Sequence, residues 1–225
     1  MITPAVTVHR IGKEGEPVAV IENFAPKPDA LRDEGVIRVF AARDDYYPGV
    51  KAPVLDDYIA AQLAVLRPIF RDVFGITNRI SVLDVCYAIV TAASDTLALK
   101  QRLPHVDGLA PGGLALIHYL VPGGSDGTAF YRHRATGFET IDRARSDSYF
   151  ASLNQDLRVH GPPPLAYLDG STPIFERIGH FDGHFNRALV YRGRLLHSGA
   201  IRADRALTSD PETGRLTITG FFATD

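Results

Sequence analysis

The spacing of apolar residues predicts two helices and two buried strands in the first hundred residues. Apolar side chains recur every three or four positions from Leu55 to Phe70, which is the period of an amphipathic helix that ends around Phe74-Gly75, and a second helical pattern covers Ala30–Ala42. The run Ile80–Thr91 is nearly continuous, apolar and rich in β-branched residues, which is typical of a buried strand. Val18–Ile21 predicts a shorter strand of the same kind.

From Pro104 onward, short strands alternate with turns of glycine, proline and aspartate. The predicted strands are 113–121, 128–133, 174–178, 188–191, 195–197 and 215–223. Ser146–Leu157 predicts one helix between them. Two or three helices supporting many short strands indicate a mainly β fold, a sandwich or a barrel. At 225 residues, we expect one domain over positions 1–225, with a supporting region at 1–103 and a strand-rich core at 104–225.

Composition and charge remove several classes of partner. Lys plus Arg number 24 against 26 for Asp plus Glu, so no basic excess favours nucleic acid or an anionic membrane. The single cysteine, Cys86, excludes a disulfide framework and suits a reducing compartment. The segment 1–16 lacks the apolar core of a secretory signal, and prolines and glycines interrupt the longest uncharged stretch, 108–125. We therefore expect a cytoplasmic protein.

His105 and Asp107 are the first candidate metal ligands. In an extended segment, side chains two residues apart project from the same face, so both could reach one ion. The alternative is a loop histidine beside a turn aspartate. A second histidine would complete a set of two histidines and one carboxylate, which suits non-haem Fe(II). His197, at the end of a short apolar strand, is the best candidate, although spacing alone does not bring it near His105.

Other histidines carry weaker signals. His180 and His184 are four residues apart, as in a helical zinc pair, but an Asp-Gly turn between them argues against a metal site. His118 has the opposite strand parity to the neighbouring tyrosine and is expected outside any cavity. The triplet Arg132–Arg134 is typical of a solvated strand end, with the mouth of a cavity as the alternative.

Two segments resemble the prolyl-4-hydroxylase-like enzymes of the Fe(II)/2-oxoglutarate-dependent dioxygenase superfamily. Ala115–Phe130 is similar to a strand, turn and strand of that family, in which a His-any-Asp pair precedes the tyrosine; here Asp107 precedes Tyr119 by twelve residues. Arg215–Phe222 is similar to the strand that follows the family's second histidine. The region 23–50 resembles an uncharacterised bacterial branch of the same superfamily.

This resemblance implies a fold and a metal site. The fold would be a double-stranded β-helix (a cupin-like jelly roll) over 104–225, with the N-terminal helices packed on one sheet. Fe(II) would be held by His105, Asp107 and His197. The co-substrate 2-oxoglutarate would chelate the iron through its keto-acid end, and O2 would take the remaining position.

The resemblance also implies an anchor for the far carboxylate of 2-oxoglutarate. Arg215 would grip it as a guanidinium fork, and the hydroxyls of Tyr119 and Thr217 would add hydrogen bonds. Arg215 follows His197 by eighteen residues, a longer interval than is usual in the family, so Arg205 is a rival anchor. Without the His-any-Asp pair, the alternation around Arg215 and Thr217 would equally describe a solvent-facing edge strand.

The implied activity is oxidative decarboxylation of 2-oxoglutarate to succinate and CO2, coupled to oxidation of a C–H bond. Asp107 favours hydroxylation, because related halogenases lack the carboxylate ligand. The substrate could be a small molecule, an amino acid or a peptide. Two alternatives stay open: a cupin-like metal-binding protein or metal-dependent hydrolase or isomerase, and an interaction protein without catalysis. The sequence carries no signal of oligomeric state.

Overall fold

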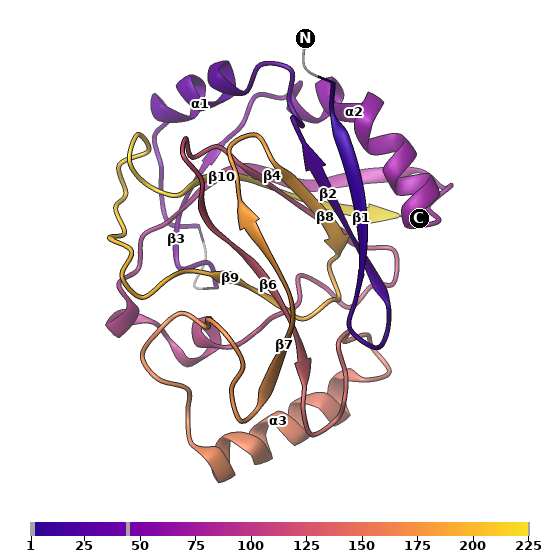
Figure 1. Cartoon of the computed structure of the whole chain (residues 1–225), viewed down its shortest axis with the longest axis vertical. Helices are drawn as coiled ribbons and strands as arrows, with labels where there is room; N and C mark the ends of the chain where they lie inside the picture. The colour runs from indigo at the N-terminus through magenta and orange to yellow at the C-terminus, as the bar shows by residue number, and fades with distance from the viewer. Residues whose placement is uncertain (1–2, 44–45, 225) are drawn as a thin grey trace.

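The computed structural model describes residues 3–43 and 46–224, and the strands of this part form two antiparallel sheets (Figure 1). The larger sheet has the order β1 (Ala5–Ile11), β2 (Glu16–Glu22), β8 (Ala188–Arg192), β5 (Leu114–Tyr119), β10 (Leu216–Thr224), β4 (Ile80–Val90) and β3 (Gly49–Pro53). The smaller sheet has the order β7 (Phe175–Gly183), β6 (Ser125–His133) and β9 (His197–Ala200). The predicted mainly β fold with a few helices is confirmed.

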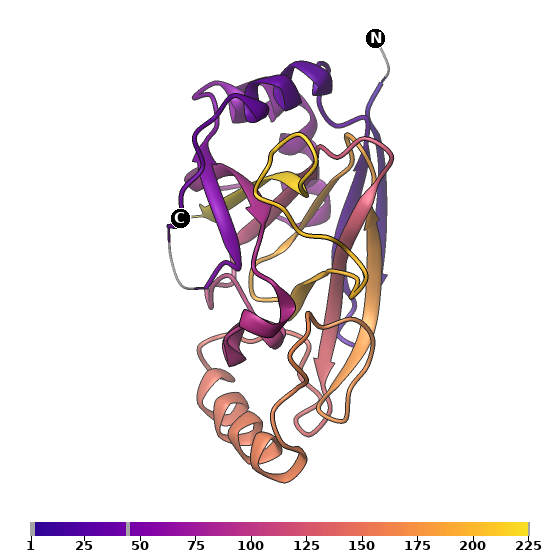
Figure 2. The same ribbon diagram turned by 90° about the vertical axis from the view of Figure 1, so that its left-hand side faces the viewer.

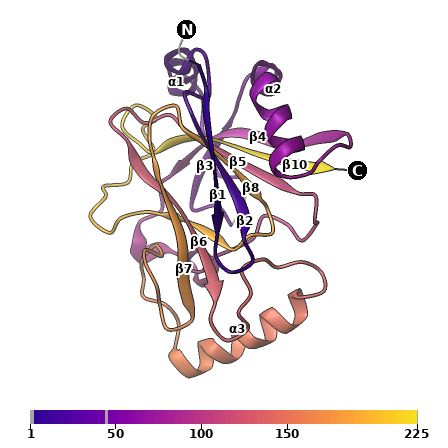
Figure 3. The same ribbon diagram turned by 45° about the vertical axis from the view of Figure 1, so that its right-hand side comes forward.

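The helices lie at opposite ends of the molecule. Helices α1 (Pro28–Val36) and α2 (Tyr58–Pro68) lie at one end and α3 (Ser146–His160) at the other (Figures 2 and 3). The helix predicted from Leu55 to around Phe74-Gly75 is α2, which a π-helical turn at Ile69–Val73 continues beyond Pro68. The helical pattern over 30–42 ends early, at Val36. Among the described residues, no helix is long and apolar enough to cross a bilayer.

Strands from both parts of the chain are hydrogen-bonded in the larger sheet. Strand β2 pairs with β8, and β10 lies between β4 and β5. The regions 1–103 and 104–225, which differ in sequence texture, therefore contribute interleaved strands, and their assignment to one domain stays a prediction. The apolar pattern did not reveal β1 and β3, which form the two edges of this sheet.

The central strands of the larger sheet are buried on both faces, which explains why they are continuously apolar. In β2, Ala19 and Ile21 belong to one core cluster, whereas Val18 and Val20 belong to another. Successive side chains of a strand point to opposite faces, so one strand serves both clusters. The first cluster includes side chains of α2, and the second includes Phe130 of the smaller sheet. The second cluster therefore lies between the two sheets.

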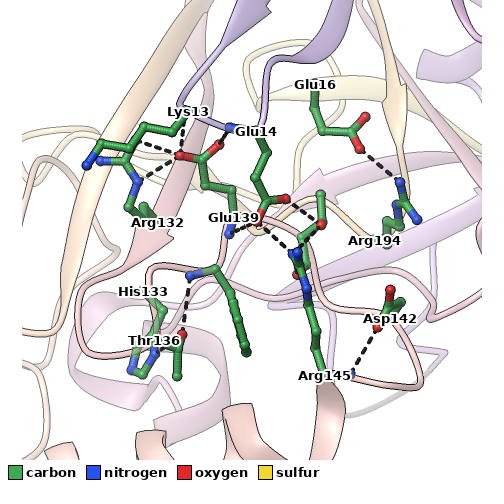
Figure 4. Close-up of polar contacts among 12 residues, drawn as sticks. Lys13, Glu14, Glu16, Arg132, His133, Thr136, Glu139, Asp142, Arg145 and Arg194 are labelled. Carbon is green, nitrogen blue, oxygen red and sulfur yellow. Dashed lines mark hydrogen bonds and ion pairs between the residues drawn. The ribbon is translucent and has the colours of Figure 1, made fainter.

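A buried carboxylate fastens the β1–β2 hairpin to the smaller sheet (Figure 4). The fully buried Glu139 accepts hydrogen bonds from the backbone N–H groups of Lys13 (2.8 Å) and Glu14 (2.9 Å) and from Nε of Arg132 (2.7 Å). Gly12 has φ +65°, and a Cβ there would lie 2.1 Å from the Glu139 carboxylate, so only glycine fits. The interpretation of Arg132 as a solvated residue is wrong, because its buried guanidinium neutralises Glu139.

Candidate metal centre

Backbone pairing brings the first candidate ligand to the second histidine. His105 and His197 form an isolated antiparallel bridge. The backbone N–H of His105 donates to the carbonyl of His197 (N to O, 2.8 Å), and that of His197 donates to the carbonyl of His105 (2.9 Å). The N–H of Asp107 donates to the carbonyl of Gly193 at 2.7 Å. The segment 105–107 is thus held in an extended conformation beside the start of β9, with both of its polar side chains near His197.

The three side chains converge on one point. Nε2 of His105 lies 3.8 Å from Oδ1 of Asp107, and Nε2 of His197 lies 3.5 Å from Oδ2 of the same carboxylate. One potential ligand atom from each residue lies within 4.8 Å of the others. Two ligands at right angles around one ion would be about 3 Å apart, so a small contraction closes the site. Within the described residues, this is the one group of three histidine, cysteine or acidic side chains that meets these distances.

His197 is oriented for ligation by its second nitrogen. Nδ1 lies 2.8 Å from the carbonyl oxygen of Leu195, which accepts a hydrogen bond from it and leaves Nε2 as the free lone pair. The ring is 6% exposed and packs against Tyr191, with 4.8 Å between ring centroids. Burial lowers the pKa of His197 to about 4, so the imidazole is neutral, as metal binding requires.

The electrostatics of the other two ligands also favour a cation. The His105 ring is half exposed, at the cavity; desolvation, and then the nearby His197, lower the pKa of His105 to about 4. Desolvation raises the pKa of Asp107 to about 6, against the opposing charges of His105 and Lys51. A bound metal ion would compensate for the water that His105 and Asp107 lose on burial, because its positive charge stabilises the carboxylate of Asp107.

The three residues open on a cavity of about 530 Å³, a size typical of small-molecule sites. Residues of both sheets line it. Its polar and aromatic lining includes Tyr46, Tyr47, Lys51, Lys100, Gln101, Thr128, Tyr167, Tyr191, Ser198, Arg215 and Thr219. Asp107 is the one carboxylate among the lining residues that the structure describes, so cations predominate in the cavity wall.

Arg215 lies in the same cavity wall and is 3% exposed. Its Nε and Nη2 donate to the carbonyls of Asp126 and Gly127, both at 3.0 Å, and its guanidinium lies 5.5 Å from the ring centre of Tyr119. No described carboxylate lies within ion-pair distance of Arg215, and the carboxylate of Asp126 instead contacts Arg205 at 3.2 Å. Burying a cation without a counter-ion is costly, so this position suits an anionic ligand.

The remaining sequence candidates have other neighbours. Tyr119 is fully buried, and its hydroxyl bonds that of Thr128 at 2.7 Å. The hydroxyl of Thr217 donates to a backbone carbonyl of β4 at 3.1 Å. Thr128 and Thr219 line the cavity. Arg205, the rival anchor, lines a second hollow together with Asp126, whereas Arg215 lines the cavity of the three ligands.

Two predictions about other histidines have different outcomes. His118 is fully buried outside the cavity lining, between Tyr58 and Asn186, as its strand parity predicted. The turn expected between His180 and His184 is wrong, because β7 continues through Gly183. Lys51, Thr128 and Tyr191 also line the cavity, although their sequence positions did not predict it. Tyr191 lies on a predicted strand, so the alternation of side chains between the two faces could have pointed to it. The strand that carries Lys51 was not predicted.

Comparison with known proteins places the chain in a family. The profile of a family of unknown function, DUF6445, matches residues 2–222. The chain belongs to this family. No curated protein matches it.

The fold of this chain is similar to the folds of several solved structures. HygX from Streptomyces hygroscopicus, with nickel, 2-oxoglutarate and hygromycin B bound, has a TM-score of 0.50 and 13% identity over 92% of this chain and 82% of that one. HygX with nickel and 2-oxoglutarate also has a TM-score of 0.50, with 15% identity over the same shares. An N-substituted L-amino acid dioxygenase from Burkholderia ambifaria, in complex with the same keto acid, has a TM-score of 0.41 and 13% identity over 99% and 95%. Because so few residues are identical, the likeness to HygX shows a similar fold and nothing more.

Proposed function

We propose that the protein is an Fe(II)- and 2-oxoglutarate-dependent oxygenase with a double-stranded β-helix core. One observation carries the proposal: a cavity shared by a convergent set of two histidines and one carboxylate and by the buried cation Arg215, which has no carboxylate partner among the described residues. The first feature suits Fe(II), and the second suits a carboxylate. The sharing of one cavity is what a ligand that bridges metal and guanidinium requires. The fold of HygX supports the same interpretation.

His105, Asp107 and His197 would hold the metal through Nε2, a carboxylate oxygen and Nε2. With 2-oxoglutarate and O2, Fe(II) supplies the oxidation of a C–H bond, with release of succinate and CO2. Asp107 occupies the third protein position, which favours hydroxylation. The hydrogen bond from His197 to Leu195 fixes the ring and its tautomer.

Arg215 would bind the far carboxylate of 2-oxoglutarate. Two of its five N–H donors are used by backbone carbonyls, which fix the guanidinium and leave donors for the ligand. The ring of Tyr119 packs beside it, and Thr128 lines the same cavity. Lys51 adds positive charge, so the cavity attracts a dicarboxylate.

The size and lining of the cavity limit the second substrate. About 530 Å³ holds 2-oxoglutarate together with a small organic molecule or the side chain of a peptide. Tyr46, Tyr47 and Tyr167 offer aromatic surface, while Lys100 and Gln101 offer donors. We expect the substrate to be an amino acid, a peptide side chain or a small metabolite.

The visible spectrum of the anaerobic complex tests this proposal. Fe(II) and 2-oxoglutarate together should give a weak metal-to-ligand charge-transfer band, because the keto acid chelates the iron. His105→Ala should abolish the band, whereas His180→Ala, which changes a histidine outside the cavity, should leave it unchanged. Tight Zn(II) or Mn(II) binding without a band or succinate would instead support the metal-dependent hydrolase or isomerase.

A further inference from the structure

Tyr191 carries a hydroxyl that the proposed site does not yet use. The residue lies on β8, is 5% exposed and lines the cavity. Its hydroxyl makes no hydrogen bond to any residue in the described part of the chain. The hydroxyls of two nearby tyrosines differ: that of Tyr119 bonds Thr128, and that of Tyr167 donates to the carbonyl of Ala92 at 2.8 Å. The hydroxyl of Tyr191 is therefore available to donate to a ligand in the cavity.

The position of Tyr191 relates it to both ends of the proposed ligand. Its ring packs against His197 and, with centroids 5.1 Å apart, against Phe130, so it is fixed in place. Asp107 and Arg215 line the same cavity as Tyr191. A molecule that spans this cavity from the metal ligands to Arg215 can therefore reach the hydroxyl of Tyr191.

The phenol is suited to donate to an anion. A phenol is neutral and carries one O–H donor, so it can donate to a carboxylate without adding a second negative charge.

We propose that the hydroxyl of Tyr191 donates a hydrogen bond to a carboxylate oxygen of bound 2-oxoglutarate and positions the keto acid between the metal and Arg215. This inference rests on the proposed function. It assigns Tyr191 to the co-substrate and not to the second substrate. The ring of Tyr191 also supports His197, but that packing needs no hydroxyl.

Tyr191→Phe tests this assignment, because it removes the hydroxyl and keeps the ring. In an anaerobic titration of the Fe(II) protein with 2-oxoglutarate, followed by the charge-transfer band, we expect the dissociation constant to rise roughly tenfold, as for one hydrogen bond to a charged group. Without metal or co-substrate, the variant should melt no lower than wild type, since it loses no protein hydrogen bond. The rise in melting temperature on adding Fe(II) and 2-oxoglutarate should be smaller in the variant.

Tyr87→Phe is the matched control. Tyr87 is fully buried outside the cavity, and its hydroxyl donates to the carbonyl of Leu31 at 2.8 Å and to Glu34 at 3.0 Å. This variant should melt lower than wild type and bind 2-oxoglutarate with unchanged affinity.

The possible failures can be told apart. If Tyr191→Phe binds 2-oxoglutarate as wild type does, or only the KM of the second substrate rises, the assignment to the co-substrate is overturned while the proposed function stands. A metal-free Tyr191→Phe protein that melts as low as Tyr87→Phe also overturns the assignment, because the hydroxyl then has a partner in the protein. If wild type gives no charge-transfer band, the proposed function fails and this inference fails with it.

Discussion

The two faces of the larger sheet differ in the partners that their polar and charged side chains have. On the face covered by α2, His118 uses both ring nitrogens: Nδ1 lies 3.0 Å from the hydroxyl of Tyr58 and Nε2 lies 3.0 Å from Oδ1 of Asn186. On the face toward the smaller sheet, Arg215 has no carboxylate partner among the described residues, and Tyr191 has no hydrogen-bond partner there. On the α2 face the histidine is fully bonded, and the buried Oε1 of Gln62 is the exception without a hydrogen-bond partner among the described residues. The cavity face has a cation and a hydroxyl that fit a ligand.

Strand β10 shows this contrast within one segment. Leu216, Ile218 and Phe222 belong to the cluster beneath α2, while Thr219 and Phe221 line the cavity. Because strand residues alternate between faces, the same nine-residue strand helps to build the core and the site. Substitutions on one face should therefore change stability, and substitutions on the other should change ligand binding.

The largest effect is expected from removing a metal ligand. His105→Ala should abolish stoichiometric binding of Fe(II) or of its redox-stable substitute Co(II), because two ligands remain where three are needed. The melting temperature without metal should change little, since the His105 ring is half exposed. Metal content and calorimetric titration measure binding. Retention of one tightly bound metal per chain would contradict the assignment.

A core substitution on the other face should affect stability alone. Leu66→Ala removes a fully buried α2 side chain and should lower the free energy of unfolding by about 2–5 kcal/mol. Urea unfolding measures the loss, and the affinity of the folded fraction for 2-oxoglutarate should match that of wild type. A large loss of that affinity would show that the two faces are coupled.

Removing the anion anchor should weaken 2-oxoglutarate binding by about 1.5–3 kcal/mol, the range for hydrogen bonds to charged groups. Arg215→Met makes this change, and Arg205→Met is its control, because Arg205 lines a different hollow. Metal affinity should stay at the wild-type value in both. If Arg205→Met shows the greater loss of 2-oxoglutarate affinity, the rival anchor is the correct one.

A smaller effect is expected from pH, which should change stability through His118 on the face covered by α2. Burial lowers the pKa of His118 to about 4, from an ordinary value of about 6.5 in the unfolded chain. The unfolded state therefore binds the proton more readily, and stability is lost as pH falls below about 6.5. His118 should contribute about 1 kcal/mol of the loss between pH 7 and 5.5. His118→Gln should reduce the pH dependence of urea unfolding by this amount; an unchanged dependence would show that His118 is not buried as a neutral ring.

Residues that are close in the sequence were the most predictable. Alternation and apolar runs predicted β2, β4, β5 and β10, and the helical period predicted α2. The edge strands β1 and β3 were not predicted. Strand β1 is largely exposed, and β3 begins at a glycine after a proline, which indicates a turn. Arg132 was misread because its partner Glu139 lies in another segment, across the turn that follows β6.

The site was predictable only in part, for the same reason. The pair His105 and Asp107 is visible from a spacing of two residues, whereas its meeting with His197 depends on a backbone bridge between distant segments. Resemblance to a family suggested that meeting, and the described structure shows the three side chains together. The hydroxyl of Tyr191 has no local signature, since only the folded chain shows which hydroxyls have partners.

The most direct test of the central claim is the affinity for 2-oxoglutarate measured with and without Fe(II) under anaerobic conditions. If one ligand bridges the metal and Arg215, wild type should bind 2-oxoglutarate tightly only when Fe(II) is present, and Arg215→Met should weaken the metal-dependent binding. Equal affinity with and without Fe(II), or no effect of Arg215→Met, would contradict a cavity in which metal and guanidinium hold the same molecule.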